Sequence, residues 1–327
     1  MRFIILTEGG ETFGLGHVSR CTSIYDALKI KGIDAHMVVA GDTSVESLLG
    51  GRSYELFAWH GNIPGFIARY PISDGIILDS IAITQGEVSD LETHFQNLTA
   101  IDDYRRYKYS NSTVVDWTVN VEKTGKHDHN KDVNTLLLGC DYAVLREPFW
   151  KMRLPPSGDE ENILITMGGA DIRDLTVPVV QNIKKKYPQV KIHIVLGPAF
   201  KNKQAVVEIA SSNVSVFHNP DSFQMYELIA SASFVVSAGG QTLYELSALR
   251  IPCIAIEVIE NQREDINGWL RMGLVYKSFV WDEEDMIKNL IISVGELLDQ
   301  GTRNRFIDDI KGEALGSGVF RILEEII

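Results

Sequence analysis

The sequence has little cysteine and no long apolar run. Its 3 cysteines are Cys21, Cys140 and Cys253, which form no Cys-x-x-Cys pair. Such spacing argues against a disulfide framework and a cysteine-rich zinc site, and it is typical of reduced thiols in a cytoplasmic protein. Nothing approaches the roughly 18 uninterrupted apolar residues of a membrane span. The short run Phe3–Leu6 also lacks the features of a signal peptide.

Basic residues are too few to balance the acidic ones. The chain of 327 residues has 31 Lys and Arg against 44 Asp and Glu, a formal net charge of -13. This balance disfavours nucleic acid or an anionic membrane as the main partner. A bound phosphate must then be held by backbone dipoles or by a few well-placed bases. With 45% hydrophobic and 23% charged residues, the chain is otherwise typical of a globular protein of about two domains.

Two nucleotide-binding signatures are incomplete or missing. In Gly14–Ser19 (GLGHVS) a serine stands where a dinucleotide fingerprint has its third glycine. Asp34 starts the second expected strand and Asp42 lies beyond its end, so neither is placed to cap it. NAD and FAD are therefore disfavoured. The chain has no Gly-Lys-Ser/Thr either, which argues against an ATP-binding P-loop, and we expect no cofactor.

Apolar runs typical of strands alternate with amphipathic helical runs along the chain. This alternation predicts parallel sheets with helices on both faces. Residues 154–161, rich in proline, glycine and charge, interrupt the pattern and indicate a linker. We therefore expect an α/β fold of two doubly wound, Rossmann-like domains. The first covers residues 1–150, and the second covers residues 151–327 and ends in closing helices.

The candidate site is the set of residues that follow the expected strands, because open parallel sheets bind ligands beyond the carboxyl ends of their strands. In the first domain these residues are Gly14, Gly16, His17, Arg20, Asp79, Asp102 and Asp103. In the second domain they are Gly168, Gly169, Asp171, Gly239, Gly240, Gln241, Thr242, Asn261 and Gln262. Each glycine pair follows a strand and precedes a helix, so bare N–H groups there can bind a diphosphate without lysine.

Two side chains, His17 and Glu245, have both a structural and a functional interpretation. His17 stands at the mouth of a helix, where it either packs against that helix or acts as a base. Asp79 or Asp102 could orient its imidazole. Glu245 lies about one and a half turns into the helix after Gly240. It is either a solvated helix residue or an acceptor for two ribose hydroxyls.

Two other clusters have a weaker claim. His127 and His129 could hold a metal, but two ligands in a polar loop make a poor site, and we expect no metal. The basic and aromatic stretch Tyr104–Tyr109 is interpreted as a solvated loop. Asp171 has a structural alternative too, since it or Asp174 can begin the helix that follows.

Taken in order, the motifs resemble a known family. The set comprises Gly14–Arg20, Asp102-Asp103, Gly139–Arg146, Met167–Asp171, Ala238–Glu245 and Asn261-Gln262. It resembles the UDP-2,4-diacetamido-2,4,6-trideoxy-β-L-altropyranose hydrolases of pseudaminic acid synthesis and their spore-coat polysaccharide relatives. It is more distantly similar to the MurG-like GT-B glycosyltransferases. The resemblance covers about residues 1–275, and one departure is Asp79-Ser80-Ile81, where family members often have Asp-x-Tyr.

The resemblance implies a GT-B fold with a cleft between two Rossmann-like domains. It implies a metal-independent UDP-sugar hydrolase, in which water attacks the anomeric carbon with inversion and UDP leaves. The pathway would be nonulosonic acid or surface polysaccharide biosynthesis. His17 resembles the catalytic histidine, Glu245 the ribose ligand, Gly239–Thr242 the diphosphate loop, and Asn261 and Gln262 sugar or phosphate contacts. An inverting glycosyltransferase and a non-catalytic nucleotide-sugar sensor are the alternatives.

Overall fold

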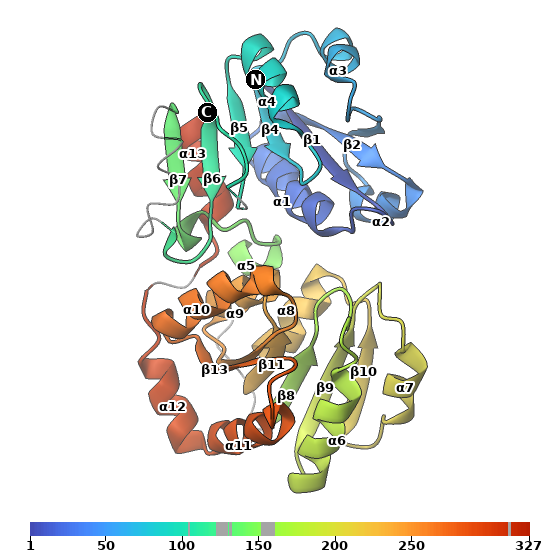
Figure 1. Cartoon of the computed structure of the whole chain (residues 1–327), viewed down its shortest axis with the longest axis vertical. Helices are drawn as coiled ribbons and strands as arrows, with labels where there is room; N and C mark the ends of the chain where they lie inside the picture. Colours follow the sequence, from blue (N-terminus) through green and yellow to red (C-terminus); the bar gives the residue numbers. More distant parts are fainter. Residues whose placement is uncertain (104, 122–129, 131–132, 152–160, 313–314) are drawn as a thin grey trace. The chain divides into compact units, whose positions relative to one another are not determined.

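The chain divides into two compact units (Figure 1). The computed structural model describes residues 1–103, 105–121, 130, 133–151, 161–312 and 315–327. The first unit comprises Met1–Glu147 with Gly316–Ile327, and the second comprises Pro148–Leu315. His127, His129, Tyr104 and nearly all of the expected linker lie outside the described residues.

A parallel sheet forms the centre of the first unit. Its described strands are β1 (Arg2–Gly9), β2 (Asp34–Gly41), β3 (Tyr54–Leu56), β4 (Gly75–Asp79), β5 (Leu98–Ile101), β6 (Thr113–Asp116) and β7 (Thr135–Leu138). They lie in the order β3-β2-β1-β4-β5-β6-β7. The order reverses between β1 and β4, and such a switch point is where open α/β sheets bind ligands.

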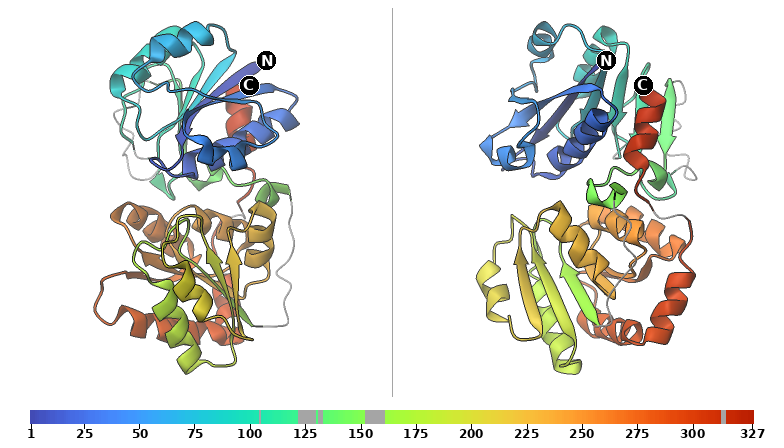
Figure 2. Two further views of the ribbon diagram at one scale, coloured as in Figure 1. Left: turned by 90° about the vertical axis from the view of Figure 1, so that its right-hand side faces the viewer. Right: turned by 180° about the vertical axis from the view of Figure 1, so that it is seen from behind.

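Helices cover both faces of this sheet (Figure 2). Those described are α1 (Gly16–Ile30), α2 (Glu46–Leu49), α3 (Ile63–Arg69), α4 (Gln85–His94) and α13 (Gly318–Ile326), with the 3-10 turns η1 (Thr43–Val45) and η4 (Cys140–Tyr142). Ile4 and Leu6 of β1 pack in one core cluster with residues of α3 and α4. The odd-numbered residues of β1 point to the opposite face, which α1 covers. A Cβ on Gly9, for example, would lie 2.4 Å from Val18 Cγ2 of α1. Because successive side chains of a strand point to opposite faces, β1 contacts α3 and α4 on one face of the sheet and α1 on the other.

The last helix, α13, belongs to the first unit and not to the second, where its position in the chain had suggested it. Val319, Ile322 and Leu323 are buried. A Cβ on Gly318 would lie 2.2 Å from the carbonyl oxygen of Ala143, so the helix begins in close contact with the end of η4. An amphipathic pattern predicts that a helix has an apolar face, but it does not identify the sheet on which that face packs.

The second unit also contains a parallel sheet. Its described strands are β8 (Asn162–Thr166), β9 (Lys191–Leu196), β10 (Val214–His218), β11 (Phe234–Ala238), β12 (Cys253–Glu257) and β13 (Val275–Val280). They lie in the order β10-β9-β8-β11-β12-β13, so the reversal falls between β8 and β11. The glycine pairs that follow these two strands therefore flank the switch point.

The described helices of the second unit are α5 (Pro148–Lys151), α6 (Thr176–Lys186), α7 (Lys203–Glu208), α8 (Ser222–Ala230), α9 (Gln241–Leu249), α10 (Arg263–Met272), α11 (Met286–Leu298) and α12 (Gln300–Asp308), with the turn η5 (Glu260–Gln262). Val179 of α6 and Leu290 of α11 share one core cluster with Ile163 and Ile254 of the sheet. Among the helices that the structure describes, none combines the length and apolar character of a membrane span.

Candidate functional site

A histidine and an aspartate meet at the switch point of the first unit. His17 lies in the first turn of α1, just beyond β1, and Asp79 is the last residue of the neighbouring strand β4. Nδ1 of His17 is 2.8 Å from Oδ1 of Asp79. The carboxylate is completely buried, whereas the imidazole keeps 13% of its surface exposed. The buried group therefore fixes the ring, and the ring remains accessible.

Arg20, about one turn further along α1, binds the same carboxylate with two nitrogens. Its Nε donates to Oδ2 of Asp79 at 2.5 Å and its Nη2 to Oδ1 at 2.6 Å. Nη1 donates to Asp103 Oδ2 at 2.8 Å, and the guanidinium lies 5.0 Å from the ring centroid of Trp117. Bidentate contacts of this kind hold a carboxylate in one orientation. Arg20 and Asp103, expected to bind substrate, here bind each other.

Asp79 is ionised despite its burial. Burial alone raises the pKa of this carboxyl, but the adjacent Arg20 and His17 outweigh that effect and hold the pKa well below its usual range. A carboxylate can only accept hydrogen bonds, so the proton of the 2.8 Å contact belongs to Nδ1 of His17. In the neutral imidazole Nε2, which makes no hydrogen bond to a described residue, is then an acceptor. This tautomer is the one that a general base requires.

The loop between β1 and α1 is closed by its own backbone. Gly10 N donates to Gly14 O at 2.9 Å, and Gly14 N donates to Gly10 O at 2.8 Å. Gly14 has φ +74°, a conformation that glycine adopts without strain. A Cβ on Gly14 or Gly16 would meet no atom within 4 Å, and α1 begins without a side-chain cap. The predicted glycines therefore leave open space beside His17.

Asp102, the other aspartate that the sequence left as a partner for His17, is used elsewhere. It accepts from the backbone N–H of Arg106 at 3.0 Å and of Tyr107 at 3.2 Å, and it is fully buried. Burial, the largest effect on this carboxyl, raises its pKa. Asp102 therefore holds the segment after β5, and Asp79 is the residue beside the imidazole.

The segment after Asp103 is not the solvated loop that we expected. Arg106 donates to the carbonyl oxygens of Ser80 and Ile81, at 2.6 and 2.5 Å. Tyr109 is only 2% exposed. Arg106 therefore attaches the segment to the loop that follows β4, and Tyr109 packs in the core of the unit. The expectation was wrong for Arg106 and Tyr109, because these side chains find their partners inside the unit.

A second histidine–carboxylate pair lies on the opposite face of the same sheet edge, and our sequence analysis did not single it out. Glu8, completely buried in β1, accepts from Nε2 of His60 at 2.8 Å. It also accepts from the Ser80 hydroxyl and from the backbone N–H groups of Ile81 and Ala82. The available signal was a charged residue in an apolar strand, since a buried carboxylate must find donors.

In the second unit, the loops after β8 and β9 meet backbone to backbone. A Cβ on Gly197 would lie 2.4 Å from the carbonyl oxygen of Gly168 and 2.5 Å from that of Gly169. Asp171, expected to bind substrate, instead accepts from the N–H groups of Leu175 and Thr176 at 2.9 and 2.7 Å. Its carboxylate therefore caps the start of α6, which was its structural alternative.

The loop after β11 combines a crowded glycine with an open one. A Cβ on Gly239 would lie 2.7 Å from Ile266 Cδ1 and 2.8 Å from Gln262 Cβ. Gly240 has φ +134° and free space where a Cβ would stand. It precedes α9, which has no side-chain cap. The backbone at this helix start is therefore not covered by a side chain of Gly240.

The remaining predicted residues lie around these loops. Gln241 is exposed and Thr242 half-buried at the start of α9. In η5, Asn261 is exposed, whereas Gln262 accepts from the backbone N–H of Val258 at 3.0 Å. Glu245 is 3% exposed, which rules out the interpretation as a solvated helix residue.

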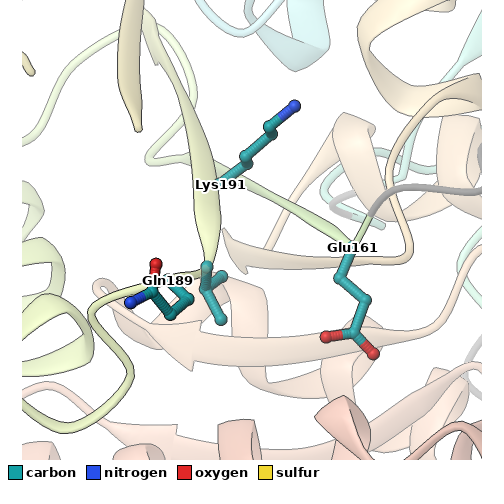
Figure 3. Close-up of a pocket in the computed structure, with 4 residues that line it drawn as sticks. Glu161, Gln189 and Lys191 are labelled. Carbon is teal, nitrogen blue, oxygen red and sulfur yellow. The ribbon is translucent and has the colours of Figure 1, made fainter. Parts of the chain in front are cut away.

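The pocket in Figure 3 lies at the other end of the second sheet. It is lined by Glu161, Gln189, Val190 and Lys191, which precede or begin β8 and β9. These are the amino ends of the strands. The glycine loops follow the carboxyl ends, so this pocket is separate from the candidate site.

No protein-family model matches the chain. It is 25% identical over 286 residues to the uncharacterised protein MJ1062 of Methanocaldococcus jannaschii, covering 83% of this chain and 58% of that protein. It is 25% identical over 261 residues to the pseudaminic acid cytidylyltransferase and UDP-2,4-diacetamido-2,4,6-trideoxy-β-L-altropyranose hydrolase of Helicobacter pylori, covering 79% and 44%. The chain thus spans about half the length of these curated relatives. A region of 129 residues is 27% identical to the spore coat polysaccharide biosynthesis protein SpsG of Bacillus subtilis, covering 38% of each.

Solved structures match almost the entire chain. Acinetobacter baumannii MurG has a TM-score of 0.66 at 11% identity and covers 100% of this chain and 99% of its own. The chain has a GT-B fold. The GT-B neighbours also include S. aureus MnaA, with a TM-score of 0.70 at 10% identity and coverage of 99% and 95%. The M. jannaschii UDP-GlcNAc 2-epimerase follows with 0.64 at 11% and 99% of both chains. The expected fold of two Rossmann-like domains is confirmed.

Proposed function

We propose that the chain is an enzyme that processes a UDP-sugar, and that it hydrolyses the bond between the sugar and UDP. The observation that carries the proposal is the 2.8 Å contact that sets His17 in the tautomer of a base at a ligand-binding sheet edge. The similarity to the Helicobacter pylori protein, whose name includes a UDP-sugar hydrolase, supports the reaction class. The same name suggests a diacetamido-trideoxy sugar, for nonulosonic acid or surface polysaccharide biosynthesis.

In the proposed reaction, Nε2 of His17 takes a proton from water as the water oxygen attacks the anomeric carbon. The bond from that carbon to the β-phosphate oxygen breaks, and UDP leaves with the electron pair. The sugar is released with inverted configuration. Ionised Asp79 stabilises the imidazolium that forms, while Arg20 keeps the carboxylate from taking the proton itself. A diphosphate is a good leaving group, so one base is sufficient, whereas a glycosidase needs two carboxylates.

The second unit supplies the nucleotide contacts in this proposal. Backbone N–H groups of the two glycine loops, where Gly168 and Gly240 leave free space in place of a Cβ, meet the negative charge that develops on the diphosphate. Glu245 binds the ribose hydroxyls, and Asn261 and Gln262 contact the sugar or phosphate. No metal is assigned a role.

The test is to incubate the protein with a panel of UDP-sugars in H₂¹⁸O without any acceptor. The panel includes UDP-2,4-diacetamido-2,4,6-trideoxy-β-L-altropyranose and UDP-N-acetylglucosamine. We expect UDP release, with ¹⁸O in the free sugar and none in UDP. Label in UDP would contradict attack at the anomeric carbon. Release that begins only when an acceptor alcohol is added would identify a glycosyltransferase instead.

A further inference from the structure

The end of β4 joins two histidine–carboxylate pairs that lie on opposite faces of the first sheet. Asp79 and Ser80 are consecutive, so their side chains point to opposite sides. Asp79 contacts His17 on the α1 face. Ser80 donates to Glu8, which also accepts from His60, just before α3 on the other face. The two histidines therefore flank the carboxyl ends of β1 and β4.

The ring of His60 is held from three directions. Its Nε2 is 2.8 Å from Oε2 of Glu8. Its centroid lies 3.9 Å from that of Trp59, which is completely buried, and 5.5 Å from that of Phe13. Phe13 belongs to the loop that Gly14 closes, immediately before His17. One loop thus contacts His60 through Phe13 and leads into the helix that carries His17.

His60 presents a single free nitrogen. Burial raises the pKa of Glu8, but its bonds from His60, Ser80 and Ile81 lower it below the usual value, so the carboxylate is ionised and accepts the Nε2 proton. Nδ1 makes no hydrogen bond to a described residue, and 24% of the side chain is exposed. Ser80 and two backbone N–H groups already satisfy Glu8, so the histidine is not needed merely to neutralise a lone acceptor.

We propose that His60 is a specificity-determining residue that binds the glycosyl group of the UDP-sugar through Nδ1. The partner is a hydroxyl or amide N–H of the sugar. This inference rests on the proposed function, because the sugar must bind at the edge of the first sheet. His17, on one face of the sheet, would then act on the anomeric carbon. His60, on the other face, would form a hydrogen bond with a polar substituent of the sugar.

The variant that isolates the free nitrogen is His60→Gln. Its amide nitrogen can still donate to Glu8 from the position of Nε2, whereas nothing replaces Nδ1. Two controls are available. His36→Gln makes the same change near the amino end of β2, where Nε2 is 3.1 Å from the hydroxyl of Tyr70. Ser80→Ala removes a donor to Glu8 without altering the ring of His60.

The experiment measures calorimetric affinities in the His17→Asn background, which prevents turnover. The probes are UDP and UDP-2,4-diacetamido-2,4,6-trideoxy-β-L-altropyranose. We expect His60→Gln to weaken binding of the UDP-sugar roughly tenfold and to leave UDP binding and the thermal midpoint unchanged. His36→Gln should change neither affinity, and Ser80→Ala should lower only the thermal midpoint.

Three results would overturn the inference, and they have different meanings. Equal UDP-sugar affinity with and without His60→Gln would remove the role of Nδ1 and leave the proposed function intact. A parallel loss of UDP and UDP-sugar affinity would mean that the substitution disturbs the fold. Failure of the parent protein to bind UDP at all would instead contradict the proposed function.

Discussion

The two units present their candidate residues in different ways. At the switch point of the first unit, polar side chains contact one another: His17, Asp79 and Arg20 form contacts of 3.1 Å or less. At the switch point of the second unit, Gly168, Gly169 and Gly240 leave free space where a Cβ would stand, and the buried charged residues nearby are Glu245 and Glu257. The comparison indicates that the first site depends on charge and the second on the absence of side-chain volume.

The largest effect is expected for Arg20→Met. The substitution leaves the buried carboxylate of Asp79 without its bidentate partner, which costs about 3–5 kcal/mol of unfolding free energy. Urea unfolding measures the loss. Arg52→Met is the matched control, because Arg52 binds Asp26 in the same bidentate way but both side chains are more than 20% exposed. A pair of that kind is worth about 1 kcal/mol or less. Equal losses would contradict the special role of the first switch point.

His17→Asn should lower turnover roughly a hundredfold or more, because a positioned base contributes about that factor. UDP affinity should stay nearly unchanged, since the proposed nucleotide contacts are in the second unit. Steady-state kinetics and calorimetry measure the two quantities. If UDP affinity fell as far as turnover, His17 would not be the base.

Asp79→Asn tests whether the negative charge of Asp79 stabilises the fold, through the free energy of unfolding measured at different pH values. The pKa of Asp79 in the folded protein is lowered from an ordinary value of 3.8, so its ionised form stabilises the fold above that pH. As pH falls, the carboxylate of Asp79 is protonated in the unfolded state at a higher pH than in the folded state. This contribution to the free energy of unfolding is therefore lost progressively below about pH 4. We expect the parent protein to exceed the variant by about 2 kcal/mol at pH 7. The difference should narrow in acid; a constant difference would contradict the ionised state.

Gly239→Ala tests whether UDP binding by the second unit requires the absence of a side chain at this loop. The new Cβ would lie within 2.8 Å of Ile266 and Gln262, so the loop or α10 must move. We expect UDP affinity to fall roughly tenfold, the size of a typical overpacking penalty. Gly301→Ala, in α12, is the control, because its Cβ would come no closer than 3.4 Å to another residue's atom. Unchanged UDP affinity in Gly239→Ala would remove this loop from the nucleotide site.

The sequence was most informative where a position follows from the order of strands. Glycine loops at strand ends, His17 after β1 and Asp79 at the end of β4 could all be predicted, because the carboxyl ends of parallel strands share one edge. The choice of Asp79 over Asp102 depended on strand order and on which donors reach each carboxylate. Neither the strand order nor the set of donors can be derived from the spacing of residues within one motif.

Other features depend on contacts between distant residues. His60 and Glu8 are separated by 52 positions, and their contact requires β1 and the segment before α3 to be neighbours. Asp171 was predicted to bind substrate because it follows a glycine pair. In the structure its carboxylate accepts hydrogen bonds from the N–H groups of Leu175 and Thr176 at the start of α6. The segment 105–109 looked solvated because its charges and rings were counted without their partners.

The return of α13 to the first unit has a practical consequence. That unit is encoded by two separate stretches of the gene, residues 1–147 and 316–327. A polypeptide that stops after residue 147 would uncover apolar surface on α1 and near Ala143, and it should precipitate when overproduced. Grafting residues 316–327 back onto such a polypeptide through a glycine-serine tether should restore solubility and provide an isolated lobe for titration.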